Sequence, residues 1–116
     1  MANKLFQGIV SQMKDAIDRE VGVIDEGSSV IACSDATKIE TVRVGVMDSA
    51  PADGILKADG YTYYFISENK KNEYAVFVKG DDEQAWRYAS MVAVAIQNVK
   101  QYFDEKFDKV NFIKNV

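Results

Sequence analysis

The sequence has no histidine, only one cysteine and only one proline. Without histidine the chain lacks the most common general base and the most common transition-metal ligand, which excludes a Cys–His nucleophile and a histidine-bound zinc site. The aspartates do not follow the spacing of a calcium loop, and no glycine-rich phosphate-binding motif occurs. We therefore expect a protein that is not an enzyme and that carries no cofactor or metal.

The cysteine usage and the lack of long apolar runs indicate a cellular compartment. One cysteine excludes an internal disulfide and fits a reducing environment, and Cys33 lies in an apolar run, as a buried structural thiol would. The N-terminal residues lack the apolar stretch of a signal peptide, and no window approaches the roughly 18 uncharged apolar residues of a membrane span. We expect a cytoplasmic protein that does not enter the membrane.

Basic charge is also scarce, since the net charge is −4 and the pI is about 4.8. Affinity for nucleic acid depends mainly on cations that neutralise phosphates, and here no cluster of Lys and Arg forms a basic stripe. If the protein regulates a gene, DNA is contacted only through a region outside this chain. The length of 116 residues, of which 47% are hydrophobic, fits one domain with one core.

Hydrophobic periodicity predicts both helices and strands. Apolar residues three and four apart indicate helices, whereas short β-branched and aromatic runs next to Gly27 and Gly60 indicate hairpins. In the two longest strands both alternating faces are largely apolar, which predicts a sheet covered on both sides. The predicted order is helix 4–19, strands 21–25 and 29–34, a short helix 36–47 that could break near Gly45, strands 54–58, 61–67 and 73–79, and a long helix from residue 81.

This order, α-β-β-α-β-β-β-α with about five antiparallel strands, defines an α+β domain. It is similar to the PAS, GAF and profilin-like (roadblock, longin) sensor folds, a similarity of fold that implies no function by itself. We expect residues 1–80 to form a PAS-like sensory core and residues 81–116 to form a C-terminal signalling helix.

The last helix has the spacing of a coiled coil. Neither proline nor glycine interrupts residues 81–116, which would span about 50 Å, and an apolar stripe alternates by four and three residues. Its first half is apolar nearly all round and is expected to pack on its own sheet, whereas after Lys100 the narrower stripe is expected to pair with a second copy. The predicted homodimer contacts are Val92, Ile96, Val99, Phe103, Val110 and Ile113.

A ligand pocket between the sheet and its covering segments is the second functional prediction. Arg43, between two valines, could hold a carboxylate by two parallel hydrogen bonds. The alternative for Arg43 is a surface arginine whose aliphatic part covers apolar neighbours. The alternative for the tyrosines is a place in the core with each hydroxyl at its edge. The candidate ligand-binding residues are Ser34, Asp35, Thr37, Arg43, Tyr61, Tyr63 and Tyr64.

Two stretches of the chain resemble the carbohydrate-diacid (CdaR/PucR-type) transcriptional regulators. They are residues 21–35, VGVIDEGSSVIACSD, followed by Lys38 and Ile39, and residues 109–116, KVNFIKNV. The resemblance implies a PAS-like ligand-sensing input domain of a bacterial transcription factor, whose last helix continues toward a C-terminal helix-turn-helix. The sugar-diacid ligand itself is not carried over, because Glu40 stands where those sensors tend to have glycine.

Two hypotheses of function follow. The first is an input domain that dimerises, senses a small organic acid or a sugar-derived ligand, and relays its state through the C-terminal helix. The second is a ligand-free scaffold of roadblock or profilin type that mediates protein–protein interaction. A closed polar-lined cavity over the sheet would favour the first, whereas a space filled by Tyr and Phe rings would favour the second.

Overall fold

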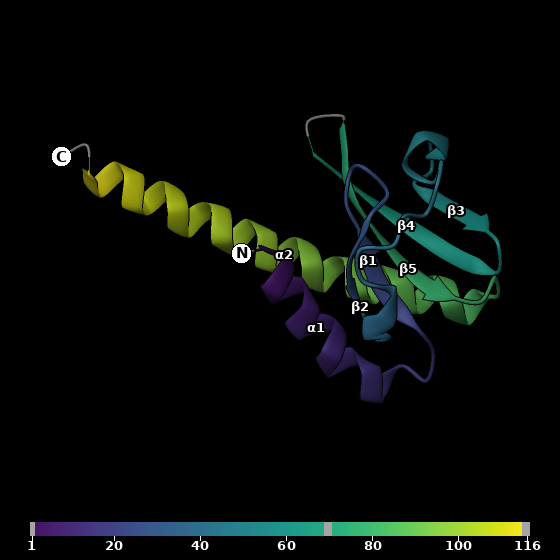
Figure 1. The fold of residues 1–116 in the computed structure, drawn as a ribbon. Coiled ribbons are helices and arrows are strands. Elements are labelled where there is room, and N and C mark those ends of the chain that lie inside the picture. The colour runs from purple at the N-terminus through teal and green to yellow at the C-terminus, as the bar shows by residue number, and fades with distance from the viewer. Residues whose placement is uncertain (1, 69–70, 115–116) are drawn as a thin grey trace.

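The computed structural model describes the backbone of residues 2–68 and 71–114, and the side chains of residues 4–67 and 72–100. It has a helix at each end of the chain and a sheet between them (Figure 1). The elements are α1 (Ala2–Ala16), β1 (Val21–Ile24), β2 (Val30–Cys33), the short 3-10 helices η1 (Ala36–Lys38) and η2 (Met47–Ser49), β3 (Ile55–Ala58), β4 (Tyr61–Glu68), β5 (Lys71–Lys79) and α2 (Glu83–Lys114).

The five strands form one antiparallel sheet in the order β2-β1-β5-β4-β3, which confirms the predicted α+β class. β1 lies between β2 and β5, so that Gly22 is opposite Cys33 on one side and Phe77 on the other. Both helices cover one face of the sheet, and the segment between β2 and β3 covers the other (Figure 1). The prediction of a sheet covered on both sides is therefore confirmed.

Two apolar layers result from the alternation of side chains along the strands. The helix-side core joins strand residues such as Val21, Val23 and Val78 to Phe6 and Val10 of α1 and to the first half of α2. The loop-side core joins Ile24, Val30, Cys33, Tyr63, Phe65, Ala75 and Phe77 to apolar residues of the covering segment. Cys33 is fully buried, as expected, and burial raises the pKa of its thiol.

The helix predicted over 36–47 is wrong. The segment contains only the single-turn helix η1 and the start of η2, with an irregular chain between them. Glu40 and Gly45 have φ values of 76° and 79°, which an α-helix does not allow. The break foreseen near Gly45 is thus preceded by another at Glu40.

Residues 40–43 of this segment instead run beside residues 28–30, on the outer edge of the sheet at the start of β2. The amide of Val30 donates to the carbonyl of Thr41 (2.8 Å), and the amide of Glu40 donates to the carbonyl of Val30 (2.8 Å). The amide of Arg43 donates to the carbonyl of Ser28 (2.8 Å), so the segment is held at the start of β2. This pairing covers an exposed strand edge and holds Arg43 over the loop-side face.

The helix α2 has 32 residues and is about 48 Å long. Its buried residues belong to the helix-side core, and beyond them the helix leaves the sheet (Figure 1). Val92 and Ile96 are fully buried in their own subunit and therefore cannot be the predicted dimer contacts, whereas Val99 packs against the same core but is only partly buried. The side chains of Phe103, Val110 and Ile113 lie outside the described residues.

The first half of α2 is part of the same hydrophobic core as the sheet, which agrees with the expectation that this half packs on the body of the domain. Within the described residues, neither helix has a stretch long and apolar enough to cross a membrane.

Candidate functional site

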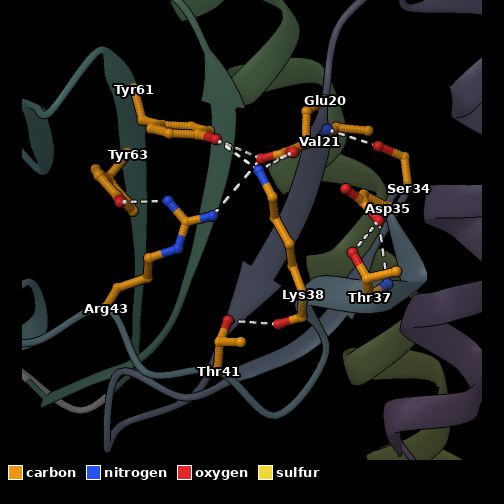
Figure 2. A network of polar contacts seen from close by, with 10 residues as sticks. All are labelled: Glu20, Val21, Ser34, Asp35, Thr37, Lys38, Thr41, Arg43, Tyr61 and Tyr63. Atoms are coloured by element: carbon orange, nitrogen blue, oxygen red, sulfur yellow. Dashed lines mark hydrogen bonds and ion pairs between the residues drawn. The ribbon is translucent and has the colours of Figure 1, made fainter.

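Five side chains from distant parts of the sequence meet on the loop-side face of the sheet (Figure 2). Glu20 directly precedes β1, Lys38 ends η1, Arg43 lies on the covering segment, and Tyr61 and Tyr63 stand on the same face of β4. We call them the Glu20 cluster. The predicted ligand residues Arg43, Tyr61 and Tyr63 are therefore brought together.

The carboxylate of Glu20 is at the centre of the cluster (Figure 2). It accepts hydrogen bonds from the ammonium of Lys38 and from the hydroxyl of Tyr61 (2.6 Å). Arg43 Nη2 lies 3.6 Å from Glu20 Oε2, which is an ion pair without a hydrogen bond, whereas Arg43 Nη1 donates to the Tyr63 hydroxyl (3.3 Å). Glu20 and Arg43 are only 12% and 16% exposed, so water screens this pair weakly.

Aromatic rings hold the Arg43 guanidinium. Its Cζ lies 4.4 Å from the centroid of the Tyr61 ring and 4.5 Å from that of Phe77, within the range of cation–π attraction. The rings of Tyr61 and Phe77 pack edge to face at 5.7 Å, and Tyr63 packs against Phe77 at 6.0 Å. Rings and the arginine side chain thus fill the space that the sequence assigned to a ligand pocket.

The cluster is charged at neutral pH. Burial alone would raise the pKa of Glu20, but the hydrogen bonds from Lys38 and Tyr61 outweigh burial, and the pKa is lower than its ordinary value of 4.5. The hydrogen bond to Glu20 raises the pKa of Lys38, and burial raises the pKa of the Tyr63 hydroxyl. Two cations and one carboxylate leave the cluster with one excess positive charge.

Ser34, Asp35 and Thr37 do not face Arg43, although they were predicted to share its ligand (Figure 2). The hydroxyl of Ser34 accepts a hydrogen bond from the amide of Val21 (3.0 Å) and so fixes the start of β1. Asp35 caps η1, because its carboxylate accepts from the amide (3.1 Å) and the hydroxyl (2.6 Å) of Thr37. These three side chains have local structural roles.

A surface hollow of about 350 Å³ lies on the other side of Glu20. Glu20 lines both the cluster and this hollow, and is therefore the residue that connects the two halves of the predicted site. The other lining residues are Lys14, Ile17, Asp18, Arg19, Ser34 and Asp35.

Tyr64 does not belong to the site. It packs against the helix-side core, whereas Tyr63 is in the loop-side core, because successive residues of a strand point to opposite faces. Tyr61 and Tyr63 share a face for the same reason. The prediction that all three tyrosines line one pocket is wrong for Tyr64.

Glu20 and Lys38 were not among the predicted site residues. A weak signal for Glu20 was present, since a carboxylate that directly precedes the buried strand residue Val21 must find a partner. Its partners Lys38 and Tyr61 are 18 and 41 residues away in the sequence, and only the strand order brings them close.

The arrangement is suited to holding a carboxylate. An ammonium, a guanidinium and a phenol surround the one carboxylate of the cluster. Among the described side chains, no group of His, Cys, Asp or Glu gathers in a way that could bind a metal ion. Comparisons with protein-family models, with curated proteins and with solved structures found no match to this chain.

Proposed function

We propose that this chain is a sensory and dimerisation input domain of a transcriptional regulator. In this proposal α2 pairs with the α2 of a second copy, and the Glu20 cluster responds to a small organic acid. Contact with DNA is made by a region outside this chain. The observation that supports the proposal most strongly is that α2 continues well past the sheet (Figure 1).

The last described side chain of α2 is that of Lys100, whose ammonium is 3.0 Å from the Glu73 carboxylate of β5. Residues 101–114 continue the helix for about another 21 Å. An isolated helix of fewer than about 12–15 residues is only marginally stable in water, so a segment of this length gains from a partner. The stripe of Phe103, Val110 and Ile113 continues the three–four spacing and would be covered by the same stripe of a second copy.

The sensory part of the proposal is supported by the chemistry of the Glu20 cluster. Lys38, Tyr61 and Arg43 already surround a carboxylate, the one supplied by Glu20. A small organic acid presents the same group. A shift of the paired helices would then report occupancy, as expected for a domain that transmits a signal through a terminal helix.

A second candidate function is the ligand-free scaffold of roadblock or profilin type. It is favoured by the rings of Tyr61, Tyr63 and Phe77, which fill the space over the sheet. A thermal-shift screen of small organic acids and sugars separates the two candidates. A specific acid that stabilises the domain supports the sensor, and the absence of any stabilising compound supports the scaffold.

Dimerisation is tested by the mass in solution of residues 1–116 and of a truncation after Lys100. We expect the full segment to have twice the 13.0 kDa of one chain at tens of micromolar, and the truncation to be a folded monomer. Light scattering coupled to size exclusion gives both masses. If both proteins are monomeric, pairing through α2 is wrong.

A further inference from the structure

Two adjacent residues, Arg19 and Glu20, contact different parts of the molecule. Glu20 reaches the cluster over the sheet, whereas Arg19 forms a two-pronged ion pair with Asp82, with Nη2 to Oδ2 at 2.8 Å. Arg19 also donates to the carbonyl of Lys79 (3.4 Å). The short link from α1 to β1 therefore joins the candidate ligand site to the segment before α2.

Asp82 determines where α2 begins. Its carboxylate accepts a hydrogen bond from the amide of Ala85 (3.2 Å), and its carbonyl accepts one from the amide of Trp86 (3.3 Å). The ion pair with Arg19 lowers the pKa of Asp82 well below its usual range, so the cap stays charged. Arg19 therefore contacts the residue that caps the first turn of the long helix.

Arg43 has unused capacity to bind a carboxylate. A guanidinium has five N–H donors, and the side-chain partners of Arg43 among the described residues are the hydroxyls of Tyr63 (3.3 Å) and Tyr61, which leaves donors for a further group. At 3.6 Å its contact with Glu20 is too long for a hydrogen bond. A carboxylate not tethered to the backbone at Glu20 could approach the guanidinium more closely.

The hollow next to Glu20 gives the displaced side chain a place to go. It is open to solvent, has a volume of about 350 Å³ and is lined by Lys14 and Arg19 as well as by the acidic groups of Asp18 and Asp35. A carboxylate leaving Lys38 and Tyr61 would therefore remain hydrated, with Lys14 and Arg19 balancing the two aspartates. This lowers the free-energy cost of vacating the cluster.

From these contacts we propose that Glu20 is the internal occupant of a site for small carboxylates. An external carboxylate exchanges with Glu20 on Lys38, Arg43 and Tyr61, and the movement of Glu20 changes the hold of Arg19 on Asp82 at the start of α2. No covalent bond changes in this exchange. The inference rests on the sensory role proposed above and specifies its ligand class and its route to the helix.

Binding is tested with sodium acetate and sodium succinate against sodium chloride at equal ionic strength. In the wild-type chain only the small fraction of molecules whose site Glu20 has vacated can bind, so the apparent Kd is the intrinsic Kd divided by that fraction. Glu20→Ala should therefore bind one of these acids at least about tenfold more tightly than the wild-type chain. Amide chemical shifts measured by NMR give both affinities. If the alanine variant is too unstable to measure, Glu20→Gln replaces it. Glutamine keeps the side-chain volume but not the charge, so the expected gain in affinity is smaller.

Adding Arg43→Leu to Glu20→Ala should abolish the gain. The site is refuted if neither Glu20 variant binds acetate or succinate beyond chloride, or if the gain survives the loss of Arg43. Dimer mass is a separate measurement, so a monomeric chain that still binds acetate contradicts the proposed pairing and leaves this site intact. If the chain is a dimer but its Glu20 variants bind neither acetate nor succinate, the carboxylate site is wrong and the proposed pairing is unaffected.

The route to α2 is tested with Trp86, the only tryptophan of the chain, which lies in the first turns of that helix. In the wild-type chain, a saturating concentration of the acid that binds should change the fluorescence of Trp86, whereas Glu20→Ala, which has no carboxylate to displace, should bind the acid without that change. Arg19→Gln in the otherwise wild-type chain should abolish the change while the NMR affinity stays within about twofold. Arg87→Gln, which removes an exposed arginine paired with Glu83 beside Trp86, should leave both signals unchanged. A fluorescence response that persists without Arg19 refutes the route.

Discussion

Replacing Glu20 with alanine removes the one carboxylate of a cluster that holds two cations. The substitution takes away the acceptor of the Lys38 ammonium and of the Tyr61 hydroxyl, and the counter-charge of Arg43. Arg43 is only 16% exposed and is held between two rings, so it cannot turn fully into water. We expect a clear loss of stability at neutral pH.

The magnitude follows from these contacts. A hydrogen bond to a charged group contributes about 1.5–3 kcal/mol, but Lys38 is 36% exposed and recovers much of its hydration when Glu20 is lost. The buried guanidinium left without a counter-charge adds to the cost. We estimate a total loss of about 2–3 kcal/mol, or a fall in Tm of about 10 °C for a domain of this size. Glu20→Gln, which keeps a hydrogen-bonding side chain, should lose about half as much.

Urea unfolding followed by far-UV circular dichroism and by Trp86 fluorescence measures these differences. Asp48→Ala, which removes an exposed carboxylate from the same covering segment, is the matched control and should change stability by less than about 0.5 kcal/mol. A loss of stability in Glu20→Ala no larger than that of the control would refute the central place of Glu20 in the cluster.

A pH series and two other substitutions test the charges and the fold. Because folding lowers the pKa of Glu20, its charged carboxylate stabilises the fold fully above pH 4.5, and this stabilisation is lost as the pH falls through the lower pKa of the folded state. The free energy of unfolding of Glu20→Gln should therefore depend less on pH below 4.5 than that of the wild type. Gly22→Ala places a Cβ 2.4 Å from the Phe77 ring and 2.5 Å from the carbonyl of Ala32, and should lower the free energy of unfolding by about 3 kcal/mol in urea titrations; a loss below about 1 kcal/mol contradicts this packing. Glu40→Gly relieves the strain of a positive φ of 76° and should raise the free energy of unfolding by up to about 1 kcal/mol, seen as a higher Tm in a thermal scan. A lower Tm contradicts this conformation.

The strands could be predicted from the sequence because their signals are local. β-branched and aromatic runs, bounded by Gly27 and Gly60, mark the hairpins that the structure contains. The helix over 36–47 could not be excluded in the same way, because Ile39, Val42 and Val46 have helical spacing. In the structure Ile39 and Val46 pack on the loop-side core while Val42, which pairs with Ser29, is 56% exposed, so the three residues do not form one face of a helix.

The candidate site was predicted only in part, for a physical reason. Arg43 could be identified as a group that binds a carboxylate, since an arginine between two valines is placed near apolar surface. That its partner is Glu20 of the same chain depends on the order of the strands, which brings together residues 23 positions apart. The alternation that separates Tyr63 from Tyr64 was available in the sequence and could have been applied.

The central claim is that the part of α2 beyond the sheet pairs with a second copy along its apolar stripe. Sedimentation velocity of two lysine variants tests it most directly, with Val110→Lys inside the stripe and Asp108→Lys outside it. We predict that the wild type and Asp108→Lys sediment as dimers of twice 13.0 kDa at tens of micromolar, and that Val110→Lys sediments as a monomer, although the aspartate substitution changes the net charge more. A monomeric wild type, or two variants that associate equally, would contradict the claim.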